Sequence, residues 1–211
     1  MLKITDLTIH YANEVILDGV CLEVGTGEVV SLVGPSGEGK TTLLRVIAGI
    51  ERAESGSVSV DGSDVTHLPT HKRGIGLVFQ DNQLFPHLTV GENIAYALRG
   101  MSKHEQQVRV NELLALGGLE GLADRDVTVI SGGEAKRVAV ARSLINDPAV
   151  IFADEPSGNL DSKNSQELHQ LFFDLRDEYK QTFVIVTHNN ELAKMTDRKL
   201  IMQDGNIITN E

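Results

Sequence analysis

A glycine-rich stretch at residues 34–42 contains the residue types that bind nucleoside phosphates. It reads GPSGEGKTT and follows a short apolar run, VVSLV, at residues 29–33. Glycines let the backbone turn tightly and bring its N–H groups close to phosphate oxygens. The spacing G-x-x-x-x-G-K-T predicts a phosphate-binding loop between a strand and a helix, whose positive end points at the same anion. The residues expected to bind the nucleotide here are Gly34, Pro35, Ser36, Gly37, Glu38, Gly39, Lys40, Thr41 and Thr42.

Four side chains could carry the chemistry of a nucleoside triphosphate with magnesium. Lys40 can reach the β- and γ-phosphates, and the Thr41 hydroxyl can ligate Mg2+. The apolar run AVIFA, at residues 149–153, ends in Asp154 and Glu155. A carboxylate at the end of a buried strand can support the metal, so we expect Asp154 to lie near Thr41. Glu155 can polarise an attacking water and is the candidate general base.

Strands and helices alternate along most of the chain, and they must position these groups. Apolar runs predict buried strands at 29–33, 75–79, 149–153 and 183–186. Helical periodicity predicts helices at 42–48, 90–98, 102–116, 131–144, 163–179 and 190–195. Such alternation predicts an α/β fold with a mainly parallel sheet.

Two further regions are expected beside this core. Alternating apolar and polar residues at 2–11, 15–24 and 57–60 predict an antiparallel β subdomain, with a turn at residues 13–14. Cys21, the only cysteine, lies in the second of these runs and is expected to be buried. We interpret residues 84–127 as a helical subdomain inserted in a single domain that spans 1–211.

The composition is that of an ordinary globular chain and limits its partners. Of 211 residues, 41% are hydrophobic and 23% are charged, and the formal net charge is −11. This acidity argues against sequence-independent nucleic-acid binding and against docking on an anionic membrane surface. The chain opens without a signal-peptide pattern, and no apolar run approaches the roughly 20 residues of a membrane span. We therefore expect a cytoplasmic protein with no nucleic acid partner and no direct membrane insertion.

Short motifs beyond the phosphate loop complete an ordered set. They are Tyr11 at a strand end, Gln80 after a strand, SGGE at residues 131–134, SGNLD at residues 157–161 and His188 after FVIVT. With GPSGEGKT and VIFADE, this set resembles the nucleotide-binding subunit of an ATP-binding cassette (ABC) transporter, over essentially all 211 residues. The resemblance implies an ATPase with a P-loop NTPase core, an antiparallel β subdomain and an inserted helical subdomain.

The resemblance also implies roles for residues outside the phosphate loop. Tyr11 would stack on adenine, and Gln80 would bridge Mg2+ and the lytic water. His188 would hydrogen-bond the γ-phosphate and hold Glu155 in place. The residues implied to face the ATP of a second copy in trans, within an ATP-sandwich homodimer, are Ser131, Gly132 and Gly133. Glu134 and Asp161 are further residues expected to bind the nucleotide.

Membrane-spanning permease subunits are the further partners that the resemblance implies, so the protein would lie at the inner face of the cell membrane. The apolar residues Leu84, Phe85 and Leu88 suggest that the surface from Gln80 to Ala97 contacts the permease, although these side chains could also pack inward.

Three residues depart from the family pattern. Ile130 stands where the family usually has Leu, and Glu134 stands where it usually has Gln. Glu134 offers fewer donors near the phosphates or ribose, which would lower the ATPase rate. Glu38 places a carboxylate inside the phosphate loop, where we expect it to point to solvent.

The two halves of the chain resemble different branches of the family. Residues 71–98 resemble importer subunits for small solutes, whereas residues 154–205 resemble lipoprotein-releasing and macrolide-exporter-type subunits. A composite chain is one explanation, and the transported substrate and its direction stay open.

Other functions within the family are also distinguishable. DNA-repair and chromosome-associated members carry long coiled-coil insertions, but residues 81–130 contain no heptad pattern. Translation-factor members carry two cassettes, whereas each motif occurs once here. A cell-division-type ATPase, which regulates a membrane partner without transporting anything, is the alternative that stays open.

Overall fold

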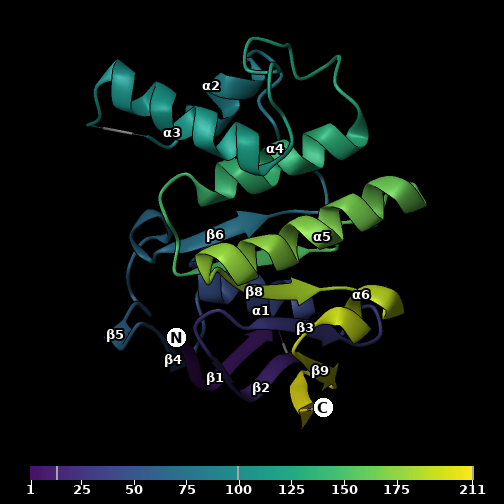
Figure 1. The fold of residues 1–211 in the computed structure, drawn as a ribbon. Coiled ribbons are helices and arrows are strands. Elements are labelled where there is room, and N and C mark those ends of the chain that lie inside the picture. Colours follow the sequence, from purple (N-terminus) through teal and green to yellow (C-terminus); the bar gives the residue numbers. More distant parts are fainter. Residues whose placement is uncertain (13, 99, 211) are drawn as a thin grey trace.

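A six-stranded sheet forms the centre of the computed structural model, which describes residues 1–12, 14–98 and 100–210 (Figure 1). Its strand order is β10-β9-β3-β8-β7-β6. The strands are β3 (Val29–Val33), β6 (Ile75–Val78), β7 (Val150–Asp154), β8 (Thr182–Val186), β9 (Arg198–Gln203) and β10 (Asn206–Asn210). All neighbours are parallel except β9 and β10, which form an antiparallel hairpin. The predicted mainly parallel sheet is therefore confirmed.

A second, antiparallel sheet has the order β2-β1-β4-β5. Its strands are β1 (Leu2–Tyr11), β2 (Glu14–Val24), β4 (Ser55–Val60) and β5 (Ser63–Asp64). Of the turn predicted at residues 13–14, Asn13 lies outside the described residues and Glu14 already belongs to β2. The prediction that Cys21 is buried is wrong, since its side chain is exposed. Period-two alternation turns Val20 and Leu22 inward and leaves Cys21 on the outer face.

The helices agree with the predicted ranges to within a few residues. They are α1 (Lys40–Ala48), α2 (Val90–Ala95), α3 (Lys103–Leu116), α4 (Gly132–Leu144), α5 (Ser162–Tyr179) and α6 (Asn190–Met195), with a 3₁₀ turn η1 (Thr70–Lys72). The predicted helix at 90–98 is shorter, because Leu98 N–H bonds Ala95 O and tightens the chain into a turn. Among the described residues, no helix combines the length and the apolar character needed to cross a membrane.

The central sheet is covered on both faces. Helices α4 and α5 lie over one face, with α2 and α3 beyond them, and their apolar side chains form one buried cluster with Ile151 and Phe183 of the sheet (Figure 1). The opposite face packs against α1 and the antiparallel sheet, through Phe152 and Val184. Burial on both faces explains why β7 and β8 are continuous apolar runs instead of alternating ones.

Helices α2 and α3 lie within the range interpreted as an inserted subdomain. The start of α2 is tied to the segment before α4, since Val90 N–H bonds Arg125 O and Gly91 N–H bonds Ala123 O. Thr89 and Asp126 also form an isolated β-bridge. The segment therefore leaves and returns at neighbouring points, while the boundaries at 84 and 127 stay a prediction.

The parallel strands all end at the same edge of the sheet. Residues 34–42 follow β3, Gln80 comes two residues after β6, Glu155 follows β7, and His188 comes two residues after β8. Parallel α/β sheets bind ligands at the carboxyl ends of their strands. The topology therefore brings together four segments that are far apart in the sequence.

Candidate active site

A cavity of about 350 Å³ lies at this edge of the sheet. It is lined by Tyr11, Ile16, Ser36, Gly37, Gly39, Lys40, Thr41, Thr42, Gln80, Asp154, Glu155 and Val186. Ten of the candidate site residues thus lie together at one concave site, while their roles stay a prediction. Its lining has the features expected of a phosphate site, with backbone donors, one lysine and two carboxylates.

Glycine 39 shapes the phosphate loop where α1 begins. Its φ of 90° lies in the left-handed region, and a Cβ placed on it would lie 2.6 Å from Ile16 O. Lys40 Nζ donates to the carbonyls of Gly34, at 2.8 Å, and Pro35. The loop is therefore folded around the ammonium group that is expected to bind phosphate.

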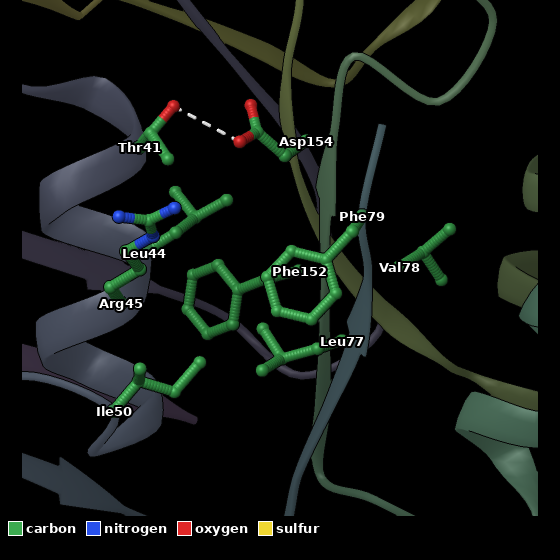
Figure 2. Close-up of a pocket in the computed structure, with 9 residues that line it drawn as sticks. All are labelled: Thr41, Leu44, Arg45, Ile50, Leu77, Val78, Phe79, Phe152 and Asp154. Carbon is green, nitrogen blue, oxygen red and sulfur yellow. Dashed lines mark hydrogen bonds between the residues drawn. The ribbon is translucent and has the colours of Figure 1, made fainter. Parts of the chain in front are cut away.

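Thr41 and Asp154 meet across the interface between α1 and the sheet. Thr41 Oγ1 donates to Asp154 Oδ2 at 3.0 Å, the dashed line in Figure 2. Below this bond, the rings of Phe79 and Phe152 pack toward Leu44 of the helix, around a void of only about 10 Å³. This apolar packing fixes the distance between the hydroxyl and the carboxylate.

The Thr41–Asp154 pair fits a hard divalent cation. Burial raises the pKa of the Asp154 carboxyl, the bond from Thr41 opposes this, and the neighbouring charge of Glu155 raises the pKa further. A carboxylate in such surroundings gains from a nearby cation. No group of three or more His, Cys, Asp or Glu is arranged so that it could hold a metal ion by itself among the described residues, but Mg2+ takes few protein ligands when phosphates and water supply the rest.

Glu155 is held in a constrained position beside His188. Its φ of 45° is unusual for a residue other than glycine, and such strain concentrates at functional sites. Its backbone N–H bonds Val186 O at 2.9 Å. Its side chain is only 17% exposed and lies 2.8 Å from His188 Nδ1, while the His188 side chain is 76% exposed. The histidine therefore faces open space on one side and the candidate base on the other.

Tyr11 lies at the wall of the cavity, at the end of β1. Its side chain is 47% exposed, and its hydroxyl donates to the Glu51 carboxylate. This hydrogen bond is the main cause that raises the pKa of Tyr11. The ring is thus anchored at its hydroxyl while remaining accessible to a ligand.

Residues 131–134 (SGGE), which resemble the signature sequence of the family, and Asp161 form a separate group. Ser131 caps α4 with a capping box, in which its Oγ accepts from Glu134 N–H at 3.2 Å and its own N–H donates to the Glu134 carboxylate at 2.7 Å. Asp161 caps α5 by accepting from the backbone N–H and the side-chain amide of Asn164. Residues 131–134 and Asp161 do not line the 350 Å³ cavity of the described chain.

Glu38 differs from its predicted orientation. Instead of pointing to solvent, its carboxylate accepts a hydrogen bond from Asp204 N–H in the turn between β9 and β10. The reason is that the β9–β10 hairpin lies against the phosphate loop, and this long-range contact has no signal in the sequence pattern. Glu38 is thereby directed away from the residues that line the cavity.

Two cations on α4 were missed by sequence reasoning. Lys136 and Arg142 donate to backbone carbonyls in residues 79–83, next to Gln80. Charged residues within a helical pattern are expected at the surface, but Lys136 is buried and Arg142 is half-buried. The alanines and valines beside them are the only sequence feature that indicates burial.

Comparisons with known proteins agree with this geometry. A family model described as ABC transporter matches residues 17–158. The lipoprotein-releasing system ATP-binding protein LolD of Bacteroides fragilis (strain YCH46) is 47% identical over 99% of this chain and 100% of its own. The Fe(3+) ions import ATP-binding protein FbpC of Streptomyces coelicolor is 44% identical over 98% of this chain and 60% of its own. Both branches thus match nearly the whole chain, and nothing in these matches shows a composite origin.

Solved structures are similar along the full chain. The dimeric structure of MJ0796, described as a bacterial ABC transporter cassette, has a TM-score of 0.89 and 36% identity, and it covers 100% of this chain and 98% of that one. A post-hydrolysis state of the same cassette, bound to ADP and Pi, has a TM-score of 0.88. Together with the phosphate loop and carboxylates in one cavity, these matches show that the chain belongs to the ABC transporter family, as an ATP-binding subunit with ATPase chemistry.

Proposed function

We propose that two copies of the chain hydrolyse ATP with Mg2+ at composite sites, and that this reaction drives a membrane-spanning permease. The observation that carries the proposal is the cavity that brings Lys40 together with Asp154 and Glu155, which lie far from it in the sequence. A lysine suited to phosphate, a carboxylate suited to a cation and a carboxylate suited to water are the parts that ATP hydrolysis needs.

The chain's own groups bind and orient the nucleotide. Tyr11 offers its accessible ring to adenine, and the N–H groups of residues 34–42 face the phosphates together with Lys40. Glu155 accepts the proton of the attacking water as general base. His188 holds the Glu155 carboxylate from 2.8 Å, although it lines the neighbouring cavity of about 250 Å³ instead of the one that contains Lys40. Its exposed side chain would hydrogen-bond the γ-phosphate when ATP is bound.

Magnesium would be held by the groups that already pair across the cavity. Thr41 and Asp154 supply a hydroxyl and a carboxylate oxygen, with Gln80 as a third oxygen donor. When bound, Mg2+ supplies positive charge that offsets the charge on the phosphates. Asp154 thereby gains the cation that its partly buried carboxylate lacks.

A second copy would complete each site. Gly132 and Gly133 open α4 after the N-cap Ser131, and their N–H groups would form an anion site that is not part of the chain's own cavity. Similarity to two dimeric cassette structures supports a homodimer in which these residues and Asp161 face the partner's ATP.

A permease would bind on the side of the inserted helices and hold the protein at the inner face of the cell membrane. Tyr96 is 58% exposed, and its ring lies 4.2 Å from that of Phe85. Asn93 fixes this loop through bonds to Phe85, Leu88 and Thr89. An exposed tyrosine packed on the half-buried Phe85 ring is suited to contact a protein partner.

Lipoproteins are the cargo class that we favour. The LolD relative is 47% identical along its entire length, compared with 44% for the iron importer subunit. In vesicles that contain the copurified permease, ATP should drive release of a lipoprotein and no uptake of iron or polyamine. A membrane partner that is bound without movement of any cargo would instead support the cell-division-type alternative.

The Glu155→Gln variant tests the hydrolysis proposal. It should bind ATP yet turn it over at least about a hundred-fold more slowly, because the general base is lost. It should also form a persistent dimer with ATP on size-exclusion chromatography, since hydrolysis no longer separates the two copies. Glu178→Gln, at an exposed position of α5, is the matched control. Wild-type turnover by Glu155→Gln would remove Glu155 from the mechanism.

A further inference from the structure

Two basic side chains of helix α4 donate hydrogen bonds to the backbone of the segment that follows β6. Lys136 Nζ donates to the carbonyl oxygens of Phe79, at 3.2 Å, and Gln80. Arg142 donates to Gln83 O at 2.8 Å and Asn82 O at 3.1 Å. Four of the five carbonyls in residues 79–83 are therefore held by one helix.

Lys136 makes its hydrogen bonds to backbone carbonyls and has no carboxylate within ion-pair distance among the described residues. Its side chain is only 3% exposed, and it belongs to no ion pair within 4.0 Å among the described residues. Burial lowers the pKa of its ammonium, and the charges of Asp81 and Asp154 oppose this. A buried ammonium needs hydrogen-bond acceptors, so losing the two carbonyls would be costly.

The residue that Lys136 holds also reaches the active site. Gln80 accepts from Lys136 through its backbone carbonyl, while its side chain lines the cavity with Lys40 and Asp154. The backbone position of Gln80 decides where its amide projects. Ser131 caps the same helix five residues before Lys136, so one rigid element joins the signature serine to Gln80.

We propose that Lys136 is a positioning residue for ATP hydrolysis, fixing Gln80 relative to the metal and water sites and coupling it to the Ser131 end of α4. This inference rests on the proposed role of Gln80 in the reaction. Lys136 itself does not line the cavity, so it acts through Gln80 and not on the nucleotide. Its loss should lower kcat and leave the KM for ATP nearly unchanged.

A double-mutant cycle tests this indirect action. Lys136→Met removes the ammonium with little change in side-chain length, and it should lower kcat about ten-fold, the effect of losing one charge-assisted bond. In a Gln80→Ala background the same change should have almost no further effect, because the side chain that it positions is absent. Lys136→Gln, which retains N–H donors, should recover part of kcat and keeps the test open if Lys136→Met does not fold.

Arg137→Met is the matched control. Arg137 is the next residue on α4, but it pairs with Glu167 of α5 at 3.2 Å instead of with residues 79–83. Its effect on kcat should be small and the same in both backgrounds. Thermal melts of every variant separate loss of folding from loss of rate.

Three results would overturn the inference. Wild-type kcat in Lys136→Met, or an equal loss of kcat with and without the Gln80 side chain, would show that Lys136 only supports the fold. Either result leaves the proposed ATPase site intact. Wild-type kcat in Gln80→Ala would remove both the role of Gln80 and the inference about Lys136.

Discussion

Asp154 and Glu155 are adjacent in the chain but lie in different surroundings. Asp154 ends β7 and accepts from Thr41, and its pKa is raised mainly by burial. Glu155 turns out of the strand at a φ of 45° and pairs with His188. One carboxylate is thus placed to gain from a cation and the other to gain from a histidine, which supports the separate roles proposed for them in metal binding and base catalysis.

The residue identities at this site were predictable, but their strain and pairing were not. The spacing of residues 34–42 and the carboxylates after an apolar run indicate chemistry directly, because few other functions need those types together. The left-handed backbone of Glu155 depends on how β7 meets the loop beside β8, and the hydrogen bond that Asp204 N–H donates to the Glu38 carboxylate depends on the closing hairpin. Such contacts join residues far apart in sequence, so local patterns carry no signal for them.

Asp154→Asn should stabilise the nucleotide-free protein while abolishing hydrolysis. The pKa of Asp154 is higher in the folded state than its ordinary value of 3.8, so the folded state binds the proton more tightly than the unfolded chain does. This contribution to stability is fully present below pH 3.8 and is lost as the pH rises through the folded-state pKa. At pH 7.5 the uncharged amide of the variant avoids the free-energy cost of burying a charged carboxylate, and it should raise the melting temperature by about a few degrees.

Thermal melts at pH 7.5 and pH 5.0 check this prediction, and the advantage of the variant should shrink at the lower pH. Asp174→Asn, at an exposed position of α5, serves as the control. ATP with Mg2+ should raise the melting temperature of the wild type much more than that of Asp154→Asn. A variant that melts below the wild type at pH 7.5 would contradict the assigned cause.

At the scale of elements, helix starts were the most predictable features. The capping box of Ser102 and Glu105 begins α3 where the sequence predicts a helix at 102–116, and the same arrangement at Thr89 and Ser131 begins α2 and α4. Helix packing was less predictable. Lys136 is buried against residues 79–83, although lysine is almost never fully buried without a partner.

His169 is a second buried polar residue that links two elements. It lies on α5 at 4% exposure, and its Nε2 is 3.0 Å from Ser157 Oγ. Burial lowers its pKa, while the charge of Glu191 on α6 opposes this. His169 lines a cavity of about 250 Å³, and Glu155 and His188 are further titratable residues that line this cavity. The neutral imidazole thereby ties the loop after β7 to α5.

His169→Gln should reduce the acid sensitivity of folding. The pKa of His169 is lower in the folded state than its ordinary 6.5, so the unfolded chain binds more protons below that pH. Wild-type stability should therefore be complete above pH 6.5 and fall as pH drops toward the folded pKa. Glutamine can keep the bond to Ser157 without titrating.

Urea unfolding between pH 5 and pH 8 measures this difference. The free energy of unfolding should fall less steeply with acid in His169→Gln than in the wild type. His104→Gln, at an exposed position of α3, should leave the slope unchanged. Parallel curves for His169→Gln and the wild type would show that His169 does not carry the pH dependence.

At the scale of the whole molecule, the residues proposed to serve ATP divide into two sets. The phosphate loop, Gln80 and the carboxylates share one cavity, whereas residues 131–134 and Asp161 do not line it. The α/β core follows from the alternation of strands and helices, and the order of strands brings the first set together. The second set can serve ATP only if another copy supplies the cavity, and a single sequence reveals this only through family resemblance.

Mixing two inactive variants tests this division. Lys40→Ala removes the phosphate-binding ammonium, and Ser131→Arg blocks the signature end of α4. Each homodimer should be inactive, because both of its composite sites carry one lesion. In a heterodimer, one site pairs the intact loop of the Ser131→Arg chain with the intact Ser131 of the Lys40→Ala chain, while the other site carries both lesions.

A mixture in equal amounts should therefore regain part of the wild-type rate, with at most one competent site in each heterodimer. Activity of the wild type should also rise more than linearly with concentration where the dimer dissociates. Inactivity of the mixture, with heterodimers confirmed by sedimentation, would mean that Ser131 acts within its own chain. Strictly proportional wild-type activity in a protein that sediments as a monomer would lead to the same conclusion, since one copy would then contain every group that hydrolysis requires.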